Sequence, residues 1–296
     1  MHLLILKRGA TGDVVRTTAL LRRFDCPVTW VTEDRNVDLL RGLPGDVECV
    51  PWSDRDGIAA REFDLAINLE DDVETGAFLK TLRTGKVFGA YLNDKGDVAY
   101  TDDAKPWFDM SLISVFGRQQ ADLLKLKNRK TYQELIFGSL GFQFQGEKYV
   151  LPVPAKTDLS GDIAISPVAG AVWPMKNWAC YDALKSRLEA DGFRVNVLPK
   201  RPTMLEHLGD VANHRLLVSG DSLPMHLAMG CGVRCVTLFT CTSPWEIYDY
   251  GIQTQIVSPR LEEFFYKRGM DPAATTAIPL DEVHAAVMHQ LKLAVA

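Results

Sequence analysis

A carboxylate and an imidazole follow an apolar run in the last third of the chain. In residues 216–228, read LLVSGDSLPMHLA, the apolar run stops at Gly220, and Asp221 and Ser222 open the next segment. This pattern predicts a buried parallel strand that leads into the N-terminus of a helix. The free N–H groups of a helix start favour phosphate oxygens, and Asp221 and His226 would lie beside them. An ordinary capped helix with a core histidine is the alternative interpretation.

A second carboxylate stands near the beginning of the chain. Lys7, Arg8, Gly12 and Asp13 lie between an apolar run, residues 3–6, and an apolar-periodic segment, residues 14–24. This order predicts a strand, a glycine-containing turn and a helix, with two cations and a carboxylate at the end of the strand. The third glycine of a dinucleotide-binding fingerprint is missing, which argues against a nicotinamide or flavin site. The alternative for Asp13 is a helix N-cap.

A lysine follows a loop of small residues in the middle of the chain. The loop reads PVAGAVWPMKNW and includes Gly170 and Lys176. Small residues near a strand end, followed by a lysine just before a helix, suit a bound diphosphate, because the ammonium reaches an anion that backbone amides also contact. The alternative is a solvated surface lysine.

Strand and helix patterns alternate around these residues. In the first half, short β-prone runs are found at residues 28–31, 47–50, 64–69 and 86–91. A second series has strands at 162–166, 194–198, 215–219, 233–239 and 254–257, with helices at 179–190, 204–211, 222–229, 260–267 and 281–293. Such alternation predicts open parallel sheets and an α/β fold.

The two series are separated by less regular sequence. Residues 92–128 are only weakly periodic, with a predicted hairpin near 93–101 and a polar stretch that carries Trp107 and Phe108. This connection is either a substrate-facing insertion or a solvated excursion. A helix at 131–140 closes the first half, and Pro152, Pro154 and the polar run 156–161 mark a linker.

Composition narrows the class of protein. At 296 residues, the chain is long enough for two domains. A net charge of -5 predicts no general attraction to nucleic acid, and a small molecule is the expected partner. No stretch reaches about 18 apolar residues and the N-terminus shows no signal-peptide pattern, so we expect a cytoplasmic protein. Cys231, Cys235 and Cys241 cluster without a CxxC pair, which favours reduced thiols over a metal site.

Three motifs together resemble glycosyltransferase family 9, the heptosyltransferase-like enzymes of the GT-B fold. They are KRGATGDVVRT, SPVAGAVWPMKNW and LLVSGDSLPMHLAMGCGVRCVTLFTCTSPWEIYDYG, and their order and spacing extend over nearly the whole chain. The resemblance implies two Rossmann-like domains whose parallel sheets face a central cleft. Residues 1–153 would form the acceptor side and residues 154–296 the donor side, with the last helix packing back on the first domain.

The resemblance also implies a reaction. Family members transfer a sugar with inversion and without a metal or cofactor, from a nucleotide-diphosphate donor, commonly ADP-heptose, to a saccharide or glycolipid acceptor, as in lipopolysaccharide assembly. Acceptors in capsule, glycoprotein or a secondary metabolite are equally compatible with these residues. A lipid-linked acceptor would bring the enzyme to the inner membrane, where Lys125, Lys127, Arg129 and Lys130 could assist. The alternative for those charges is a solvated helix face.

Roles follow from matching the motifs residue by residue. Asp13 resembles the family's general base, Lys176 its diphosphate-binding lysine and Asp221 its donor-binding aspartate. The further donor-side residues are Ser222, Leu223, His226, Gly170 and Glu206, and the acceptor-side residues are Lys7, Arg8 and Gly12. A carboxylate over the acceptor hydroxyl can take its proton, while a cation and helix amides stabilise the charge on the departing diphosphate.

Some positions depart from the family pattern. Leu223 stands where the family usually has glycine, and its side chain can obstruct the approach of backbone to phosphate. Ala171 and Val172 lack the hydroxyls of some relatives, and the segment 198–216 is short, with Glu206 as its one candidate for a ribose contact. Two alternatives follow: a catalytically silent nucleotide-sugar-binding protein with the GT-B fold, or another GT-B enzyme such as an epimerase or phosphorylase.

Overall fold

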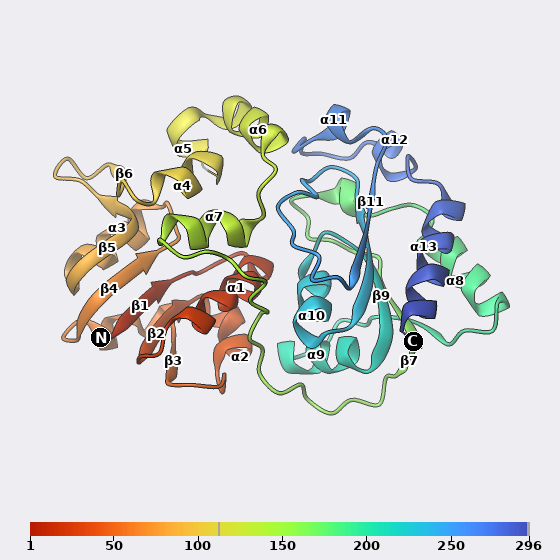
Figure 1. Cartoon of the computed structure of the whole chain (residues 1–296), viewed down its shortest axis with the longest axis horizontal. Helices are drawn as coiled ribbons and strands as arrows, with labels where there is room; N and C mark the ends of the chain where they lie inside the picture. The colour runs from red at the N-terminus through yellow and green to blue at the C-terminus, as the bar shows by residue number, and fades with distance from the viewer. Residues whose placement is uncertain (112, 295–296) are drawn as a thin grey trace. The chain divides into compact units, whose positions relative to one another are not determined.

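The chain folds into two compact α/β units, Met1–Val153 and Pro154–Ala296. The computed structural model describes residues 1–111 and 113–294, and each unit contains one sheet with helices packed on it (Figure 1). The boundary falls between Pro152 and Pro154, in the stretch predicted to be a linker. The predicted α/β class with two parallel sheets is confirmed.

The sheet of the first unit has six strands in the order β3-β2-β1-β4-β5-β6. Their bounds are β1 Leu3–Leu6, β2 Val28–Thr32, β3 Val47–Pro51, β4 Glu62–Asn68, β5 Arg83–Leu92 and β6 Val98–Tyr100. The first five are parallel, and β6 pairs antiparallel with β5 as the predicted hairpin. All four residues of β1 are buried, because a central parallel strand is covered on both faces.

The helix predicted at residues 14–24 is only partly α-helical. The structure has α1 at Thr11–Thr17, followed by a 3-10 helix, η1, at Thr18–Arg23. The hydroxyls of Thr17 and Thr18 donate to the carbonyls of Asp13 and Val15, each at 2.6 Å. Such back-bonding by threonine competes with regular helix geometry, which explains the change at this point. The other short helices here are η2 Asp34–Asn36, α2 Val37–Leu40, η3 Trp52–Ile58 and α3 Val73–Thr81.

The weakly periodic segment 92–128 is largely helical, which corrects the prediction of an irregular connection. Its helices are α4 Lys105–Ser111, α5 Ile113–Phe116 and α6 Arg118–Lys127, followed by α7 Tyr132–Ser139. Trp107 and Phe108 of α4 are buried, and the Trp107 ring meets Phe108 and Tyr132 edge to face. Helices of four to ten residues show too few turns for a clear periodicity, so their core contacts are visible only in three dimensions.

The sheet of the second unit has five parallel strands in the order β11-β10-β9-β7-β8. The strands are β7 Gly161–Ser166, β8 Val195–Val197, β9 His214–Gly220, β10 Arg234–Phe239 and β11 Gln253–Val257. In the centre of the sheet, Ile163 of β7 lies opposite Leu216 of β9, and Ile165 lies opposite Val218. These four side chains are buried in the core of the unit.

Helices cover both faces of this second sheet (Figure 1). They are η4 Pro174–Lys176, α8 Tyr181–Ala190, α9 Met204–Ala212, α10 Leu223–Cys231, α11 Leu261–Phe264, α12 Pro272–Thr275 and α13 Leu280–Leu293. Helices α8 and α13 share a core with the sheet through Leu184, Leu188, Val283 and Val287, while α9 and α10 lie on the opposite face. The predicted packing of α13 against the first unit stays a prediction.

The described helices are short. The longest, α13, has 14 residues, or about 21 Å at the rise of an α-helix. The apolar part of a bilayer is about 30 Å thick. None of the helices in residues 1–111 and 113–294 has the length and apolar character needed to cross a membrane.

Candidate active site

The predicted acceptor-side residues follow β1, beside the end of β4. Leu6 at the end of β1 lies opposite Asn68 at the end of β4. Because parallel strands bring their carboxyl ends to the same edge of a sheet, the residues after them meet there. Lys7 and Glu70 do so, with the ammonium 2.8 Å from Oε1 of the carboxylate.

Glu70 holds the loop between β1 and α1. Its Oε1 atom accepts three hydrogen bonds, from Nζ of Lys7 at 2.8 Å, from N–H of Arg8 at 2.7 Å and from N–H of Gly9 at 3.1 Å. Burial lowers the pKa of Lys7, but Glu70 and Asp13 raise it above its usual value, so the ammonium stays charged. Glu70 was not among the predicted site residues, because only the strand register shows that it lies beside Lys7.

Arg8 is bound on several sides. Its Nε donates to Glu33 at 2.9 Å, and its Nη1 donates to Glu74 at 3.1 Å and to the hydroxyl of Thr75 at 3.0 Å. The guanidinium also stacks over the ring of Trp52 at 3.7 Å, and only 15% of the side chain is exposed. Arg8 therefore anchors this end of the sheet, and its predicted role in binding an acceptor stays a prediction.

Asp13 lies in the first turn of α1 and is partly exposed. The N-cap of α1 is Ala10, so the alternative interpretation of Asp13 as the N-cap is wrong. Gly12 precedes it in the same turn. The carboxylate lies 2.8 Å from Nη2 of Arg16, and 36% of the side chain is exposed. Arg16 stacks at 3.9 Å over Tyr132, and its charge stabilises the ionised carboxylate that a general base requires.

Lys176 and Asp221 form an ion pair in the second unit. The ammonium donates to Oδ2 of Asp221 at 2.8 Å and to the backbone carbonyl of Asp221 at 2.7 Å. The hydroxyl of Thr242 donates to the same Oδ2 at 2.8 Å. The side chains are only 11% and 16% exposed, so the interpretation of Lys176 as a solvated surface lysine is wrong.

The carboxylate of Asp221 is strongly acidic. Burial raises its pKa, but Lys176, His226 and the hydrogen bond from Thr242 lower the pKa to about 2. Asp221 is therefore ionised at neutral pH and neutralises part of the charge on Lys176. A diphosphate bound at Lys176 would have to replace or share this carboxylate.

Close backbone packing fixes the position of Lys176. A Cβ atom at Gly220 would lie 2.9 Å from the carbonyl oxygen of Lys176, closer than real Cβ contacts allow. Glycine at the end of β9 thus lets η4 approach the strand. From the other side, the hydroxyl of Thr240 donates to the carbonyl of Met175 at 2.7 Å. The lysine backbone is held between the ends of β9 and β10.

The first turn of α10 offers few donors to an anion. Ser222 is the N-cap, but its hydroxyl donates to the carbonyl of Gly220 at 3.2 Å and does not cap the helix. Leu223 begins the helix, Pro224 has no N–H, and the N–H of Met225 bonds to the carbonyl of Ser222 at 3.1 Å. The backbone N–H of Leu223 is the donor best placed for a phosphate oxygen.

His226 is one of the buried residues of α10. Its side chain is buried, as the alternative of a core histidine requires. It also lies near enough to Asp221 to lower the pKa of that carboxyl. His226 is thus a core residue of α10 and also acts electrostatically on Asp221.

Two predicted donor-side residues, Glu206 and Gly170, have hydrogen-bond partners other than Lys176 and Asp221. Oε2 of Glu206 accepts from N–H and hydroxyl of Thr203, at 3.1 and 2.8 Å, in a capping box that starts α9. Gly170 is exposed in the loop after β7, where its carbonyl accepts from N–H of Trp173 at 3.2 Å. Their roles toward a ribose and a diphosphate stay predictions.

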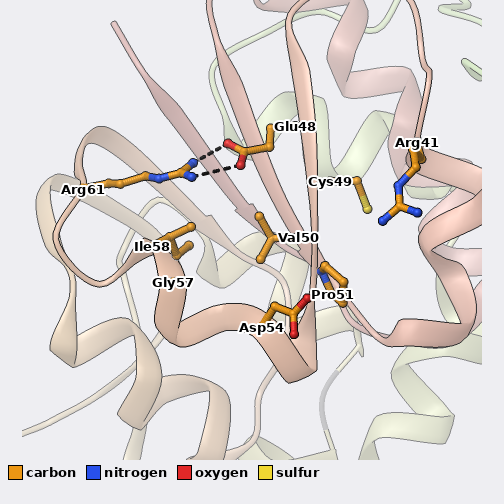
Figure 2. A pocket seen from close by; sticks show the side chains of 9 residues that line it. All are labelled: Arg41, Glu48, Cys49, Val50, Pro51, Asp54, Gly57, Ile58 and Arg61. Atoms are coloured by element: carbon orange, nitrogen blue, oxygen red, sulfur yellow. Dashed lines mark hydrogen bonds and ion pairs between the residues drawn. The ribbon is translucent and has the colours of Figure 1, made fainter.

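A hollow of about 290 Å³ lies beside β3 in the first unit (Figure 2). Nine residues line it: Arg41, Glu48, Cys49, Val50, Pro51, Asp54, Gly57, Ile58 and Arg61. Arg61 reaches across to the carboxylate of Glu48 with two hydrogen bonds, while Arg41 points toward Cys49 from the other side. None of the predicted site residues lines this hollow, so it is separate from both clusters described above.

The six cysteines are free thiols. Cys235 and Cys241 are buried, and burial raises the pKa of Cys235 to about 12. The thiol of Cys235 therefore stays protonated. Within residues 1–111 and 113–294, no three His, Cys, Asp or Glu side chains are grouped so that they could hold a metal ion.

Comparison with known proteins connects these features to a family. Residues 164–269, which include Lys176 and Asp221, match the family described as Glycosyltransferase family 9 (heptosyltransferase). The match covers the greater part of the second unit and none of the first. The predicted resemblance to this family is confirmed, and the protein is a glycosyltransferase. No curated protein matches the chain by sequence.

Solved structures extend this likeness to the fold of the whole chain. A glycosyltransferase family 9 protein from Veillonella parvula has a TM-score of 0.69 at 14% identity, covering 99% of this chain and 97% of its own. The E. coli heptosyltransferase WaaC, solved with ADP, has a TM-score of 0.64 at 16% identity, covering 98% and 100%. E. coli ADP-heptose lps heptosyltransferase II has a TM-score of 0.62 at 14% identity, covering both chains fully. The predicted GT-B fold is confirmed.

Proposed function

We propose that this glycosyltransferase transfers a sugar, most simply a heptose, from a nucleotide-diphosphate donor to a saccharide or glycolipid acceptor. The observation that carries the proposal is the ion pair of Lys176 and Asp221 inside the family 9 domain. It places a nearly buried cation at the carboxyl ends of parallel strands, where α/β proteins bind nucleotides. Two solved forms of WaaC contain ADP and ADP-2-deoxy-2-fluoro heptose, which supports an ADP-sugar as the first donor to test.

The proposed step is a direct displacement with inversion. The acceptor hydroxyl attacks the anomeric carbon as Asp13 takes its proton, and the bond from that carbon to the diphosphate oxygen breaks. The electron pair leaves with the nucleoside diphosphate, whose negative charge Lys176 and the N-terminus of α10 stabilise. One glycosidic bond forms, one glycosyl phosphate bond breaks, and the proton ends on Asp13.

A transfer assay with the Asp13→Asn variant tests this step. We expect wild type to convert ADP-heptose and a heptose-accepting core saccharide to product and ADP, measured by mass spectrometry. Losing a general base typically lowers the rate about 100- to 10,000-fold, and asparagine keeps the shape of the side chain. Asp94→Asn, an exposed aspartate in the turn between β5 and β6, serves as the control. An Asp13→Asn rate equal to that of the control would remove Asp13 as the base.

Stereochemistry and metal dependence are tested on the same reaction. Inversion predicts that the product has the opposite anomeric configuration to the donor, which NMR of the product measures. Metal-independent transfer predicts an unchanged rate after treatment with EDTA and in the presence of added divalent cations. Retention of configuration, or a rate restored only by metal, would contradict the proposed mechanism. The cytoplasmic location stays a prediction as well.

A catalytically silent binding protein is the second candidate. Two observations favour it. The ammonium of Lys176 is already paired with Asp221. In the first turn of α10, Leu223 and Pro224 limit access to backbone donors. Calorimetric titration with ADP and ADP-heptose separates the candidates. Tight donor binding without turnover over a range of acceptors would support the silent protein. Conversion of the donor without an acceptor would instead indicate an epimerase, and its consumption with inorganic phosphate a phosphorylase.

A further inference from the structure

Arg16 lies between the proposed base and an aromatic ring. Its Nη2 atom is 2.8 Å from Oδ1 of Asp13, and its guanidinium carbon lies 3.9 Å from the centre of the Tyr132 ring. Only 13% of the Arg16 side chain is exposed. A cation over an aromatic face is attracted by the negative face of the ring, and the attraction is stronger where water is excluded. The ring of Tyr132 therefore restricts where the guanidinium, and with it the ion pair, can lie.

The hydroxyl of Tyr132 is connected to Asp13 through Thr17. It lies 2.7 Å from the hydroxyl of Thr17, which donates its own hydrogen to the carbonyl of Asp13 at 2.6 Å. A threonine hydroxyl has a single hydrogen, so Tyr132 is the donor to Thr17. One side chain of α7 is thus connected to both the carboxylate and the backbone of Asp13 in α1.

Tyr132 itself is held on several sides. It is the first residue of α7 and directly follows the N-cap Thr131, which forms a capping box with Glu134. The residue is only 6% exposed, and Trp107 of α4 meets the ring edge to face, with the two centroids 5.7 Å apart. Core packing and the helix cap therefore give the ring a fixed position from which it can orient Arg16.

We propose that Tyr132 is a positioning residue for Asp13 in the transfer reaction. The ring holds Arg16 against one carboxylate oxygen, and the hydroxyl holds the backbone of α1 through Thr17. The carboxylate is then oriented before an acceptor hydroxyl arrives, which is the condition for rapid proton transfer. The inference rests on the proposed function, because it requires Asp13 to take that proton. A tyrosine that only filled the core would affect stability alone.

Two substitutions of Tyr132 test its ring and its hydroxyl separately. Tyr132→Leu removes both, and we expect kcat in the transfer assay to fall about 10- to 100-fold while KM for the donor stays unchanged. Tyr132→Phe keeps a ring over Arg16, so kcat should stay within about threefold of wild type. Tyr132→Met takes the place of Tyr132→Leu if leucine prevents folding. Normal kcat without the ring would overturn the proposal, as would a Tyr132→Phe protein as slow as Tyr132→Leu.

A double-mutant cycle shows whether Tyr132 acts through Arg16. Arg16→Met removes the ion pair with Asp13 and should lower kcat by a factor similar to that of Tyr132→Leu. If both residues act on the same carboxylate, Tyr132→Leu should change kcat by less than about threefold once Arg16 is methionine. Losses that multiply in the double variant would overturn the proposal, because the two side chains would then act independently.

Phe137 provides a matched control in the same helix. It is also buried in α7, and Arg23 lies 6.0 Å from its ring centre, but Arg23 pairs with Glu147. Phe137→Leu should lower the unfolding temperature, measured by circular dichroism, about as much as Tyr132→Leu, and yet keep kcat within about threefold. If Phe137→Leu lowered kcat as much as Tyr132→Leu, the loss would come from core packing and the proposal would be wrong.

The Asp13→Asn variant separates this inference from the proposed function. A wild-type rate for Asp13→Asn would refute the proposed base and the role of Tyr132 together. A slow Asp13→Asn protein, combined with independent effects of Tyr132 and Arg16, would refute only the role of Tyr132.

Discussion

The ammonium of Lys176 binds Asp221 twice, through the carboxylate at 2.8 Å and through the backbone carbonyl at 2.7 Å. The second bond has a consequence for ligand binding. If a diphosphate displaces the carboxylate, the carbonyl still holds the lysine beside the N-terminus of α10. The cation is thereby positioned before a ligand arrives, which reduces the cost of ordering it on binding.

Removing the cation of this pair should destabilise the protein strongly. Lys176→Met leaves the nearly buried carboxylate of Asp221 without its charge partner, and breaking a buried ion pair in this way costs about 3–5 kcal/mol. Urea unfolding followed by circular dichroism measures the change. The double variant Lys176→Met/Asp221→Asn should recover much of the loss, because no unpaired charge remains.

A surface pair provides the control for that measurement. Lys185 and Glu189 form an ion pair one turn apart on α8, and both side chains are partly exposed. Lys185→Met should change the free energy of unfolding by less than about 1 kcal/mol. Equal losses of unfolding free energy in the two lysine variants would show that burial does not strengthen the pair of Lys176 and Asp221.

Stability should depend on pH through Asp221. Its folded pKa is about 2, below the usual value of 3.8, so the ionised form favours the folded state. The contribution, about 2 kcal/mol, is fully present above about pH 4 and is lost as the pH falls through 2. Unfolding curves of wild type and Asp221→Asn should therefore converge between pH 4 and pH 2. A stability difference that stays constant over this range would contradict the assigned pKa.

Glu70 is expected to act as a positioning residue for the loop that precedes Asp13. Glu70→Gln removes the negative charge that pairs with Lys7 and weakens the bonds to the amides of Arg8 and Gly9. Misplacement of a catalytic group by a fraction of an ångström can lower kcat roughly 10- to 100-fold. We expect kcat to fall while KM for the donor stays unchanged, measured in the transfer assay.

Glu74→Gln is the matched control for Glu70. Glu74 also binds this cluster, through Arg8, but more than half of its side chain is exposed. Its variant should keep kcat within about threefold, because Arg8 retains Glu33 and its stacking on Trp52. A Glu70→Gln protein with lower unfolding stability and normal kcat would show that Glu70 has only a structural role.

Gly89 should be far less tolerant of a side chain than Gly96. Both have positive φ, 106° and 83°, but a Cβ at Gly89 would lie 1.9 Å from the carbonyl oxygen of Asn68, while Gly96 faces open space. The unfavourable φ alone costs about 1–3 kcal/mol, so Gly96→Ala should lose about that much and Gly89→Ala considerably more. Thermal unfolding measures both, and equal losses would show that the close contact with Asn68 relaxes without cost.

Much of the fold could be predicted from local pattern. The central strands contain short apolar runs that end at a polar or charged residue, and β1, β7 and β9 are found where those runs stand. The helices α4 to α6 were missed, because short helices leave little periodicity. Trp107 and Phe108 of α4 enter the core, and the contact of Trp107 with Tyr132 joins residues distant along the chain.

The sequence alone determined which side chains carry charge beside strand ends, namely Asp13, Lys176 and Asp221, because a strand followed by a turn and a helix is encoded by neighbouring residues. Only the tertiary structure decided their partners. Glu70 meets Lys7 through the pairing of β1 with β4, and Asp221 meets Lys176 where Gly220 lets η4 approach β9. Hydrogen bonds and ion pairs act over a few ångströms, and strand pairing brings residues from distant parts of the sequence within that range.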